Sequence, residues 1–174
     1  IAPEELLNYV SGPDFPTGGI ICGKAGIREA YLTGRGKIRV RGRVEIEKDA
    51  KGREHLIVSE IPYMVNKALL VKNMADLVRE KRIDGISDIR DESNKKGVRI
   101  VIDIKRDFQG DIVLNNLYKF TQLEDTFGIY NLAMVNRTQP TLLPLKDMIR
   151  HYVDHRLDVI LRRTQFELKK ALAR

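Results

Sequence analysis

Basic and apolar residues alternate along residues 37–47, and this pattern gives the first indication of the fold. Lys37, Arg39, Arg41 and Arg43 occupy successive odd positions, and the even positions between them are small or apolar. A two-residue period is typical of a β-strand with one face in a core and the other in water. The stretch therefore predicts a strand of an antiparallel sheet, and we call its four cations the basic row.

Further strands are predicted where short apolar runs are separated by turn residues. The Asp-Ala-Lys-Gly sequence at 49–52 predicts a hairpin turn that leads into a second strand at 55–61. Two more strands are expected at 86–90 and 98–104, on either side of a polar turn. Residues 129–143 predict short strands with a turn near 136–139. Residues 15–22, which Gly and Pro interrupt, are expected to be extended.

Helices are predicted where apolar residues recur every three or four positions. The clearest pattern runs from about residue 66 to residue 81, where Leu70, Met74 and Leu77 share one face. Shorter helices are expected at 26–32 and 111–120. Pro3, followed by two acids, indicates that a helix also begins near the first residues.

The last part of the chain predicts one long helix. Apolar residues step by three and four from Leu145 to the end, and no Gly or Pro intervenes. A helix over 145–174 would be about 45 Å long. It is too long to lie on a small domain, so we expect it to project and pack against another helix. The fold class is therefore α+β. We expect an antiparallel or mixed sheet domain with packed helices at 1–143 and a coiled-coil-type helix at 144–174.

Composition limits the environment and the partners. The chain has 174 residues, 31 Lys and Arg against 24 Asp and Glu, and a net charge of +7. Such a chain is attracted to polyanions. Cys22 is the only cysteine, which excludes an internal disulfide and a cysteine-based zinc site and indicates a reducing compartment. No apolar stretch approaches membrane-spanning length. The chain begins with Ile1 and ends within a helical pattern, so we expect a piece of a longer protein.

Other motifs are weaker. Gly18, Gly23 and Lys24 resemble a phosphate-binding loop, but Ala25 follows where a hydroxyl would hold Mg²⁺. His151 and His155 share a helix face but lack a third metal ligand. The acidic residues at 88–92 are explained by the residue preferences of a turn, so they need no bound cation. Asn-Arg-Thr at 136–138 fits an N-glycosylation site, but a cytosolic chain would not be glycosylated there. We find no self-contained catalytic site.

The basic row is the best candidate for a binding surface, and Arg35 and Lys67 extend it. Because aromatic residues are few and do not alternate with the cations, stacking on single-stranded bases is disfavoured. The expected partner is the phosphate backbone of a duplex, contacted with little sequence readout. A solvated face of a basic protein would show the same pattern, and the spacing alone leaves both interpretations open.

The chain resembles the A subunit of bacterial type IIA DNA topoisomerases, and the match follows the whole chain in order. Two stretches, Val-Leu-Asn-Asn-Leu-Tyr at 113–118 and Thr-Gln-Leu at 121–123, resemble the gyrase branch more than topoisomerase IV. The other matching motifs are Gly-Pro-Asp-Phe-Pro-Thr-Gly-Gly at 12–19, Tyr31 with Gly-Arg-Gly-Lys at 34–37, Glu-Ile-Pro-Tyr at 60–63, Asn-Lys at 66–67, Gly-Ile-Ser at 85–87, Arg-Asp-Glu-Ser at 90–93, Phe-Gly at 127–128, His-Arg at 155–156 and Arg-Arg-Thr at 162–164.

The resemblance implies a location and a role within that subunit. Residues 1–143 correspond to the tower domain beside the DNA gate, and 144–174 to the first part of the coiled-coil arm. The family's catalytic tyrosine lies between Arg and Thr, and none of the six tyrosines here does. We therefore expect no catalytic residue and no activity from this chain alone, although the whole enzyme is an ATP-hydrolysing DNA topoisomerase that supercoils DNA.

The resemblance also implies partners. The tower lies along the flanks of the bent gate duplex, so Arg35, Lys67 and the basic row would contact backbone phosphates. The other partners would be the B subunit, which carries Mg²⁺ and ATP, and a second A subunit in an A2B2 assembly in the bacterial cytoplasm; no cofactor is expected in this chain. Two alternatives stay open: a topoisomerase IV A-subunit fragment, and a non-enzymatic basic adapter that binds nucleic acid.

Overall fold

The computed structural model describes residues 2–135 and 139–173. Its contacts divide the chain into two compact units. Unit 1 comprises residues 1–12, 24–37 and 128–174, and unit 2 comprises residues 13–23 and 38–127. The main cluster of buried apolar residues lies within unit 2.

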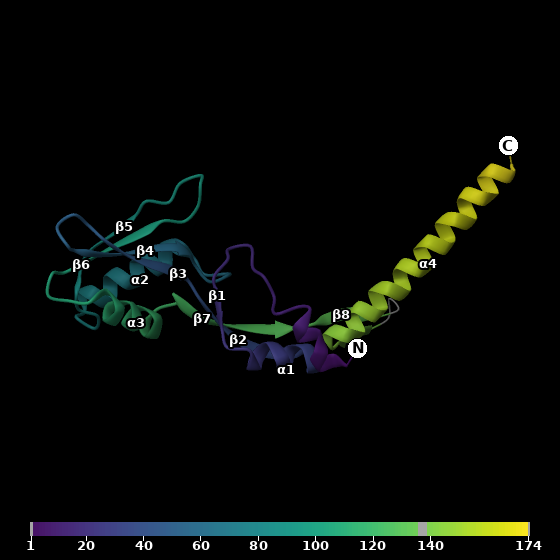
Figure 1. Ribbon diagram of the computed structural model, residues 1–174, viewed down its shortest axis with the longest axis horizontal. Coiled ribbons are helices and arrows are strands. Elements are labelled where there is room, and N and C mark those ends of the chain that lie inside the picture. Colours follow the sequence, from purple (N-terminus) through teal and green to yellow (C-terminus); the bar gives the residue numbers. More distant parts are fainter. Residues whose placement is uncertain (1, 136–138, 174) are drawn as a thin grey trace. The chain divides into compact units, whose positions relative to one another are not determined.

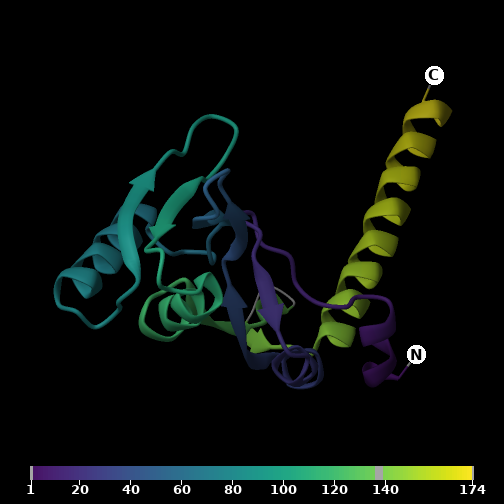
Figure 2. The ribbon, with the colours of Figure 1, turned by 60° about the vertical axis from the view of Figure 1, so that its left-hand side comes forward.

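Unit 2 is built on a four-stranded antiparallel sheet with the strand order β3-β4-β6-β5 (Figure 1). The strands are β3 (Arg43–Lys48), β4 (Glu54–Glu60), β6 (Ile100–Ile104) and β5 (Ile86–Asp91). A turn at 49–52 joins β3 to β4, and a longer loop at 92–99 joins β5 to β6 (Figure 2). The strands β4, β5 and β6 and the turn at 49–52 confirm the sequence prediction.

Two helices, α2 (Lys67–Arg79) and α3 (Gly110–Phe120), cover one face of this sheet (Figure 1). The sheet face beneath them consists of alternate apolar residues of neighbouring strands, because the register pairs Leu56 with Ile102 and Val58 with Ile100. All four of these side chains have 0% exposure. The helices contribute their own periodic apolar residues to the same cluster: Leu70, Met74, Leu77, Val113 and Leu117. The predicted helices at 66–81 and 111–120 are therefore confirmed.

The predicted single strand at 37–47 is wrong in one respect, because the structure breaks it at Gly42. Residues before the break form β2 (Arg35–Arg41), which lies between β1 (Ile20–Cys22) and β7 (Glu124–Tyr130) in a three-stranded sheet. Residues after the break form β3 in the four-stranded sheet. The Gly42 N–H donates to the carbonyl of Leu123 at 2.8 Å, and the Gly42 carbonyl accepts from the Tyr118 hydroxyl at 3.1 Å. The N–H and the carbonyl of Gly42 therefore form their hydrogen bonds with Leu123 and Tyr118, and neither bond joins β2 to β3 in one sheet. At this residue the chain passes from the three-stranded sheet to the four-stranded sheet.

Unit 1 contains the N-terminal segment, a short helix, a hairpin and the long helix. The expected N-terminal helix is a 3₁₀ helix, η1 (Pro3–Asn8), whereas α1 (Ala25–Thr33) confirms the helix predicted at 26–32. Gly34 ends α1 in a left-handed conformation, with φ of 80°. The strand β2 begins directly at Arg35, so the interruption between α1 and the strand is limited to Gly34.

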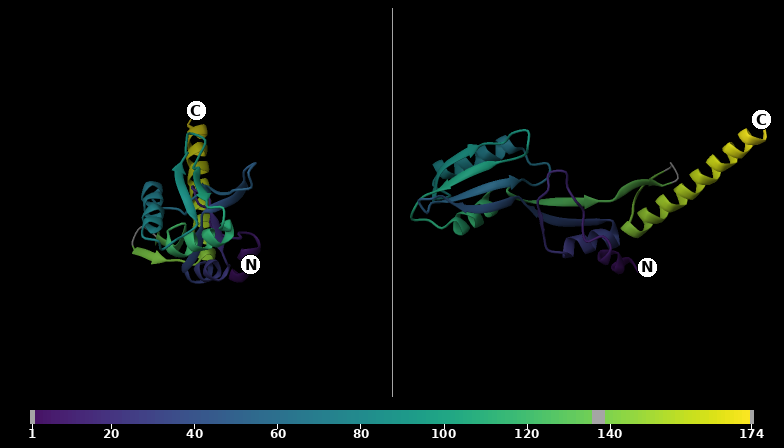
Figure 3. Two further views of the ribbon diagram at one scale, coloured as in Figure 1. Left: turned by 90° about the vertical axis from the view of Figure 1, so that its left-hand side faces the viewer. Right: turned by 45° about the horizontal axis from the view of Figure 1, so that its top comes forward.

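The hairpin of unit 1 comprises β8 (Leu132–Val135) and β9 (Gln139–Leu142), as predicted for 129–143. Three residues of its predicted turn, 136–138, lie outside the described residues. The long helix α4 (Leu145–Leu172) confirms the helix predicted from Leu145, and its start contacts η1 and α1. None of its residues is buried, and its C-terminal turns extend away from the rest of unit 1 (Figure 3).

The structure predicts that Gly85→Ala destabilises unit 2 more than Gly52→Ala. Both glycines have positive φ, 91° and 75°, so a Cβ strains both. At Gly85 the Cβ would also lie 2.7 Å from Phe108 and 2.8 Å from Val113, whereas at Gly52 no atom lies within 4 Å. We expect a loss of about 1 kcal/mol at Gly52 and about 2–4 kcal/mol at Gly85, where overpacking adds to strain. Urea unfolding measures both, and equal losses would contradict the packing argument.

Candidate nucleic-acid interface

The basic row lies on one side of β2 and at the start of β3, as the alternation predicted. The residues between its members, Ile38 and Val40, are each only 2% exposed. Lys37, Arg39 and Arg43 are exposed, and Arg41 is partly buried. Lys37 belongs to unit 1 and the three arginines to unit 2. The strand therefore directs cationic side chains away from an apolar face.

Acidic residues partly neutralise the row. The Glu124 carboxylate contacts two of its members, accepting from Arg39 Nη1 at 3.4 Å and from Arg41 Nε. Arg43 Nε lies 3.2 Å from Glu60 Oε1. Within the described part of the chain, Lys37 has no acidic partner. Two carboxylates thus offset two of the four charges, and the row retains an excess of positive charge.

Arg41 is the most constrained member of the row. Its guanidinium carbon lies 4.7 Å from the centroid of the Tyr118 ring, which places the cation over the ring face. The hydrogen bond to Glu124 raises the pKa of Arg41, so this residue stays charged. Burial raises the pKa of the Tyr118 phenol, which keeps it a hydroxyl that donates to Gly42.

The two additional cations have different surroundings. Arg35 lies over the Tyr130 ring in unit 1, at 5.2 Å from the centroid. Lys67 begins α2 in unit 2, where the Asn66 side chain caps the helix by accepting from the Leu69 N–H at 3.0 Å. Lys67 Nζ lies 2.7 Å from the Asp91 carboxylate, so its charge is largely offset within the protein.

Glu60 shows why the glycines of 18–24 are not a phosphate-binding loop. Gly18 and Gly19 have φ of 68° and 98°, and the Gly19 N–H donates to Glu60 Oε2 at 2.5 Å. This hydrogen bond is the main reason that the pKa of Glu60 is lowered. The backbone cradle already holds a carboxylate of the same chain, and a Cβ on Gly18 would collide with it.

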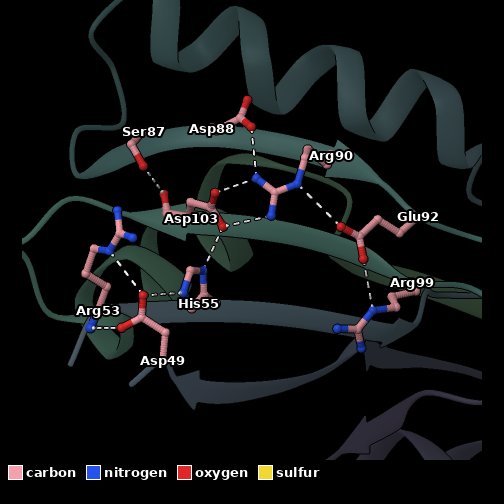
Figure 4. Close-up of polar contacts among 9 residues, drawn as sticks. All are labelled: Asp49, Arg53, His55, Ser87, Asp88, Arg90, Glu92, Arg99 and Asp103. Carbon is pink, nitrogen blue, oxygen red and sulfur yellow. Dashed lines mark hydrogen bonds and ion pairs between the residues drawn. The ribbon is translucent and has the colours of Figure 1, made fainter. Parts of the chain in front are cut away.

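The face of the four-stranded sheet opposite α2 and α3, which we call the open face, carries a second group of charged residues (Figure 4). Its centre is Arg90, which contacts Asp88 at 2.9 Å, Asp103 at 2.5 Å and Glu92 at 3.4 Å. Asp103 also lies 2.7 Å from His55 Nδ1. Every arginine in this group has a carboxylate partner, including Arg53 with Asp49 and Arg99 with Glu92. The group holds four carboxylates against three arginines, so the open face has no excess of positive charge and is a poor phosphate-binding surface.

The candidate metal ligands do not come together. Asp88 and Glu92 both pair with Arg90, and Asp91 pairs with Lys67. Residues 2–135 and 139–173 contain no group of three or more His, Cys, Asp or Glu side chains that could hold a metal ion. His151 and His155 line a groove of about 720 Å³ between α4 and the β8–β9 hairpin in unit 1. The glycosylation-type motif at 136–138 lies outside the described residues.

Sequence reasoning missed three residues of this interface: Glu124, Tyr118 and Glu60. Glu124 lies 83 positions after Arg41, and Tyr118 lies 76 positions after Gly42. Their roles depend on tertiary contacts, and no local spacing pattern signals them.

Comparison with known proteins places this chain in a protein family. The family model for the A subunit of DNA gyrase and topoisomerase IV matches residues 1–174. The DNA gyrase A subunit of Fibrobacter succinogenes is 67% identical over 171 residues, which are 98% of this chain and 19% of that protein. The DNA gyrase A subunit of Escherichia coli K12 is 56% identical over 172 residues, which are 98% of this chain and 20% of that protein.

The chain therefore belongs to the family of DNA gyrase and topoisomerase IV A subunits. The resemblance to the gyrase branch is confirmed, because the two relatives described above are both DNA gyrase A subunits. The chain spans about a fifth of their length. Family membership sets aside the alternative of an unrelated nucleic-acid-binding adapter. No helix in the described residues is long and apolar enough to cross a membrane.

The ion pairs of unit 2 predict that its stability falls in acid. Pairing with Lys67 lowers the pKa of Asp91 from 3.8 to about 2, and Arg90 lowers the pKa of Asp103. Because these pKa values are lower in the folded state, the unfolded chain binds more protons between about pH 4 and pH 2, and folding weakens as the pH falls through this window. Urea unfolding at several pH values measures the effect.

The test variant is Asp91→Asn, and its matched control is Asp107→Asn. Asp91→Asn should reduce the loss of stability between about pH 4 and pH 2, because it removes a group that titrates differently in the two states. Asp107→Asn removes an exposed carboxylate that makes no ion pair in the described chain, so it controls for the loss of one negative charge. An identical acid profile for the wild type and both variants would show that the Asp91–Lys67 pair contributes nothing measurable.

Proposed function

We propose that the chain is the tower domain and first coiled-coil segment of a gyrase A subunit, and that it contacts the DNA flanking the gate. The contact residues are the basic row with Arg35 and Lys67. The observation that carries this proposal is the excess of exposed positive charge along β2 and the start of β3, in contrast to an open face whose arginines are all paired with carboxylates.

Contacts of this kind suit an enzyme that acts on nearly any duplex. Phosphate contacts supply affinity and orientation without reading the sequence. Alternate residues of a strand lie about 6.6 Å apart, which spaces Arg39 and Arg41 regularly along β2, and Arg43 follows just after the break at Gly42. Bending a duplex costs on the order of several kcal/mol, and cation–phosphate contacts on its flanks offset part of that cost.

The long helix supports the second half of the proposal. Its large apolar residues are exposed along most of its length, for example Leu157 at 63%, Phe166 at 67% and Leu172 at 80%. A helix with an uncovered apolar face gains stability when it packs against another helix. We propose that α4 is one strand of a coiled-coil arm, in which residues 144–174 form the proximal segment and residues 1–143 the tower.

The whole protein is then an A subunit that works with a second A subunit, and with B subunits, in the bacterial cytoplasm. In this proposal the catalytic tyrosine lies in a part of the A subunit outside this chain, and Mg²⁺ and ATP are held by the B subunit. The chain alone would bind DNA without cleaving, relaxing or supercoiling it. The parent protein, combined with its B partner and ATP, should introduce negative supercoils. Decatenation without negative supercoiling would instead favour topoisomerase IV.

Replacing Arg39, Arg41 and Arg43 together by Ala should weaken binding of the 174-residue chain to a duplex of about 40 base pairs. We expect a loss of about tenfold or more at low salt, similar for two unrelated sequences, because phosphates carry no sequence information. The slope of affinity against salt should fall by up to about 3, since up to three phosphate contacts are lost. Fluorescence anisotropy over a salt series measures both quantities.

The matched control removes three exposed cations elsewhere in unit 2: Lys51, Lys95 and Lys96. This triple Ala variant lowers the net charge by the same amount but leaves the row intact. We expect a much smaller loss of affinity. If the two triple variants lose affinity equally, the attraction is diffuse and the row is not the interface.

A further inference from the structure

Arg41 differs from the rest of the basic row because its guanidinium is held on two sides. Glu124 accepts a hydrogen bond from its Nε, and the Tyr118 ring covers one of its faces at 4.7 Å. In the described chain, Arg39 has only the 3.4 Å contact to Glu124, and Arg43 only the 3.2 Å contact to Glu60. Within the row, this two-sided support is therefore particular to Arg41.

The two supporting side chains are themselves fixed. The Glu124 side chain is only 16% exposed and lies at the first residue of β7. Tyr118 lies on α3 beside the fully buried Leu117, and its hydroxyl donates to the Gly42 carbonyl at 3.1 Å. Gly42 is the residue at which the chain passes from β2 to β3. The orientation of Arg41 is therefore set by groups that also fix the backbone at this point.

This arrangement leaves the outer edge of the Arg41 guanidinium available. Glu124 uses Nε, and in the described part of the chain neither Nη nitrogen donates a hydrogen bond. The side chain is 39% exposed, compared with 61% for Arg39. A planar fork that is already oriented loses less conformational entropy when it binds an oxyanion. A partly desolvated site also strengthens the charge-assisted hydrogen bonds that it forms.

We propose that Arg41 is the oriented phosphate-binding residue of the row, and that Glu124 and Tyr118 are positioning residues that act through it. Arg39 and Arg43 contribute positive charge, but their guanidinium groups are not held in a fixed orientation. This proposal rests on the proposed function, because it assigns different roles to residues of the same DNA-contacting surface.

Substitution by lysine separates geometry from charge. Arg41→Lys keeps the positive charge but loses the planar fork, so duplex affinity should fall about tenfold. Arg39→Lys should stay within about twofold of the wild type. The salt dependence should be the same for all three proteins, because the number of charges is unchanged. Equal effects of the two substitutions, whether large or small, would overturn the special role of Arg41.

The role of the positioning residues is tested by repeating the Arg41→Lys comparison in two further backgrounds, Glu124→Ala and Tyr118→Leu. The measured quantity is the ratio of duplex affinities with Arg and with Lys at position 41. This ratio cancels any general effect of the background on net charge or stability. We expect it to fall from about ten to about two in both backgrounds, because an unsupported Arg41 loses its advantage over Lys. A ratio that stays near its wild-type value would show that Glu124 and Tyr118 do not position Arg41.

Tyr118→Phe provides the control that keeps the ring but removes the hydroxyl. Since the ring face is what supports Arg41, this background should retain most of the affinity ratio. Thermal unfolding by circular dichroism checks that each variant is folded.

Two failures remain distinguishable. If the triple Ala variant of Arg39, Arg41 and Arg43 binds DNA like the wild type, the interface itself is wrong. If that variant loses affinity but Arg41→Lys and Arg39→Lys behave alike, only the inference about Arg41 fails.

Discussion

Burial of one face of the four-stranded sheet is the constraint on which the rest of unit 2 depends. Leu56, Val58, Ile100 and Ile102 are fully buried because adjacent strands place them side by side beneath α2 and α3. A one-residue slip of β4 would turn Leu56 and Val58 away from the core and bring polar His55 and Ser59 toward it. The same register fixes the open face, since His55 must then lie opposite Asp103. The hydrophobic core therefore determines which charged groups meet on the other side of the sheet.

The open face and the three arginines of the basic row, all in unit 2, contain similar residues but differ in the ratio of carboxylates to cations. On the open face, Arg90 is surrounded by three carboxylates, and the network joins β4, β6 and β5 (Figure 4). Along the row, the single carboxylate of Glu124 forms ion pairs with two arginines, Arg39 and Arg41. A phosphate approaching the open face would have to displace existing partners, whereas in our proposal the Nη nitrogens of Arg41 would donate to a phosphate while Nε keeps its contact to Glu124. The amino-acid composition of the individual strands would not distinguish these two surfaces, because they differ in which arginines are paired with which carboxylates.

The secondary structure was predictable from the sequence largely because it depends on periodicity. The strands around 55–61 and 98–104, the helix at 66–81 and the start of the long helix at Leu145 all follow from apolar spacing. The break at Gly42 was not predictable in this way, because the alternation of β2 continues into β3 without a change of pattern. It depends on Tyr118 and Leu123, which lie far along the chain, Tyr118 by 76 positions. The cations of the candidate interface were predicted from the sequence, but the acidic and aromatic residues that contact them, Glu60, Glu124 and Tyr118, were not.

The long helix has a different physical basis from the rest of the chain. Its first turns contact α1 and η1, but none of its 28 residues is buried. Ion pairs at i, i+4 spacing, Asp158 with Arg162 and Arg163 with Glu167, stabilise it locally. Such pairs are exposed and contribute little, and a helix in a protein owes most of its stability to packing of an apolar face. Because that face is uncovered in the described chain, our proposal of a coiled-coil arm implies that the stability of α4 depends on a partner helix, whereas the apolar residues of unit 2 are buried within the unit itself.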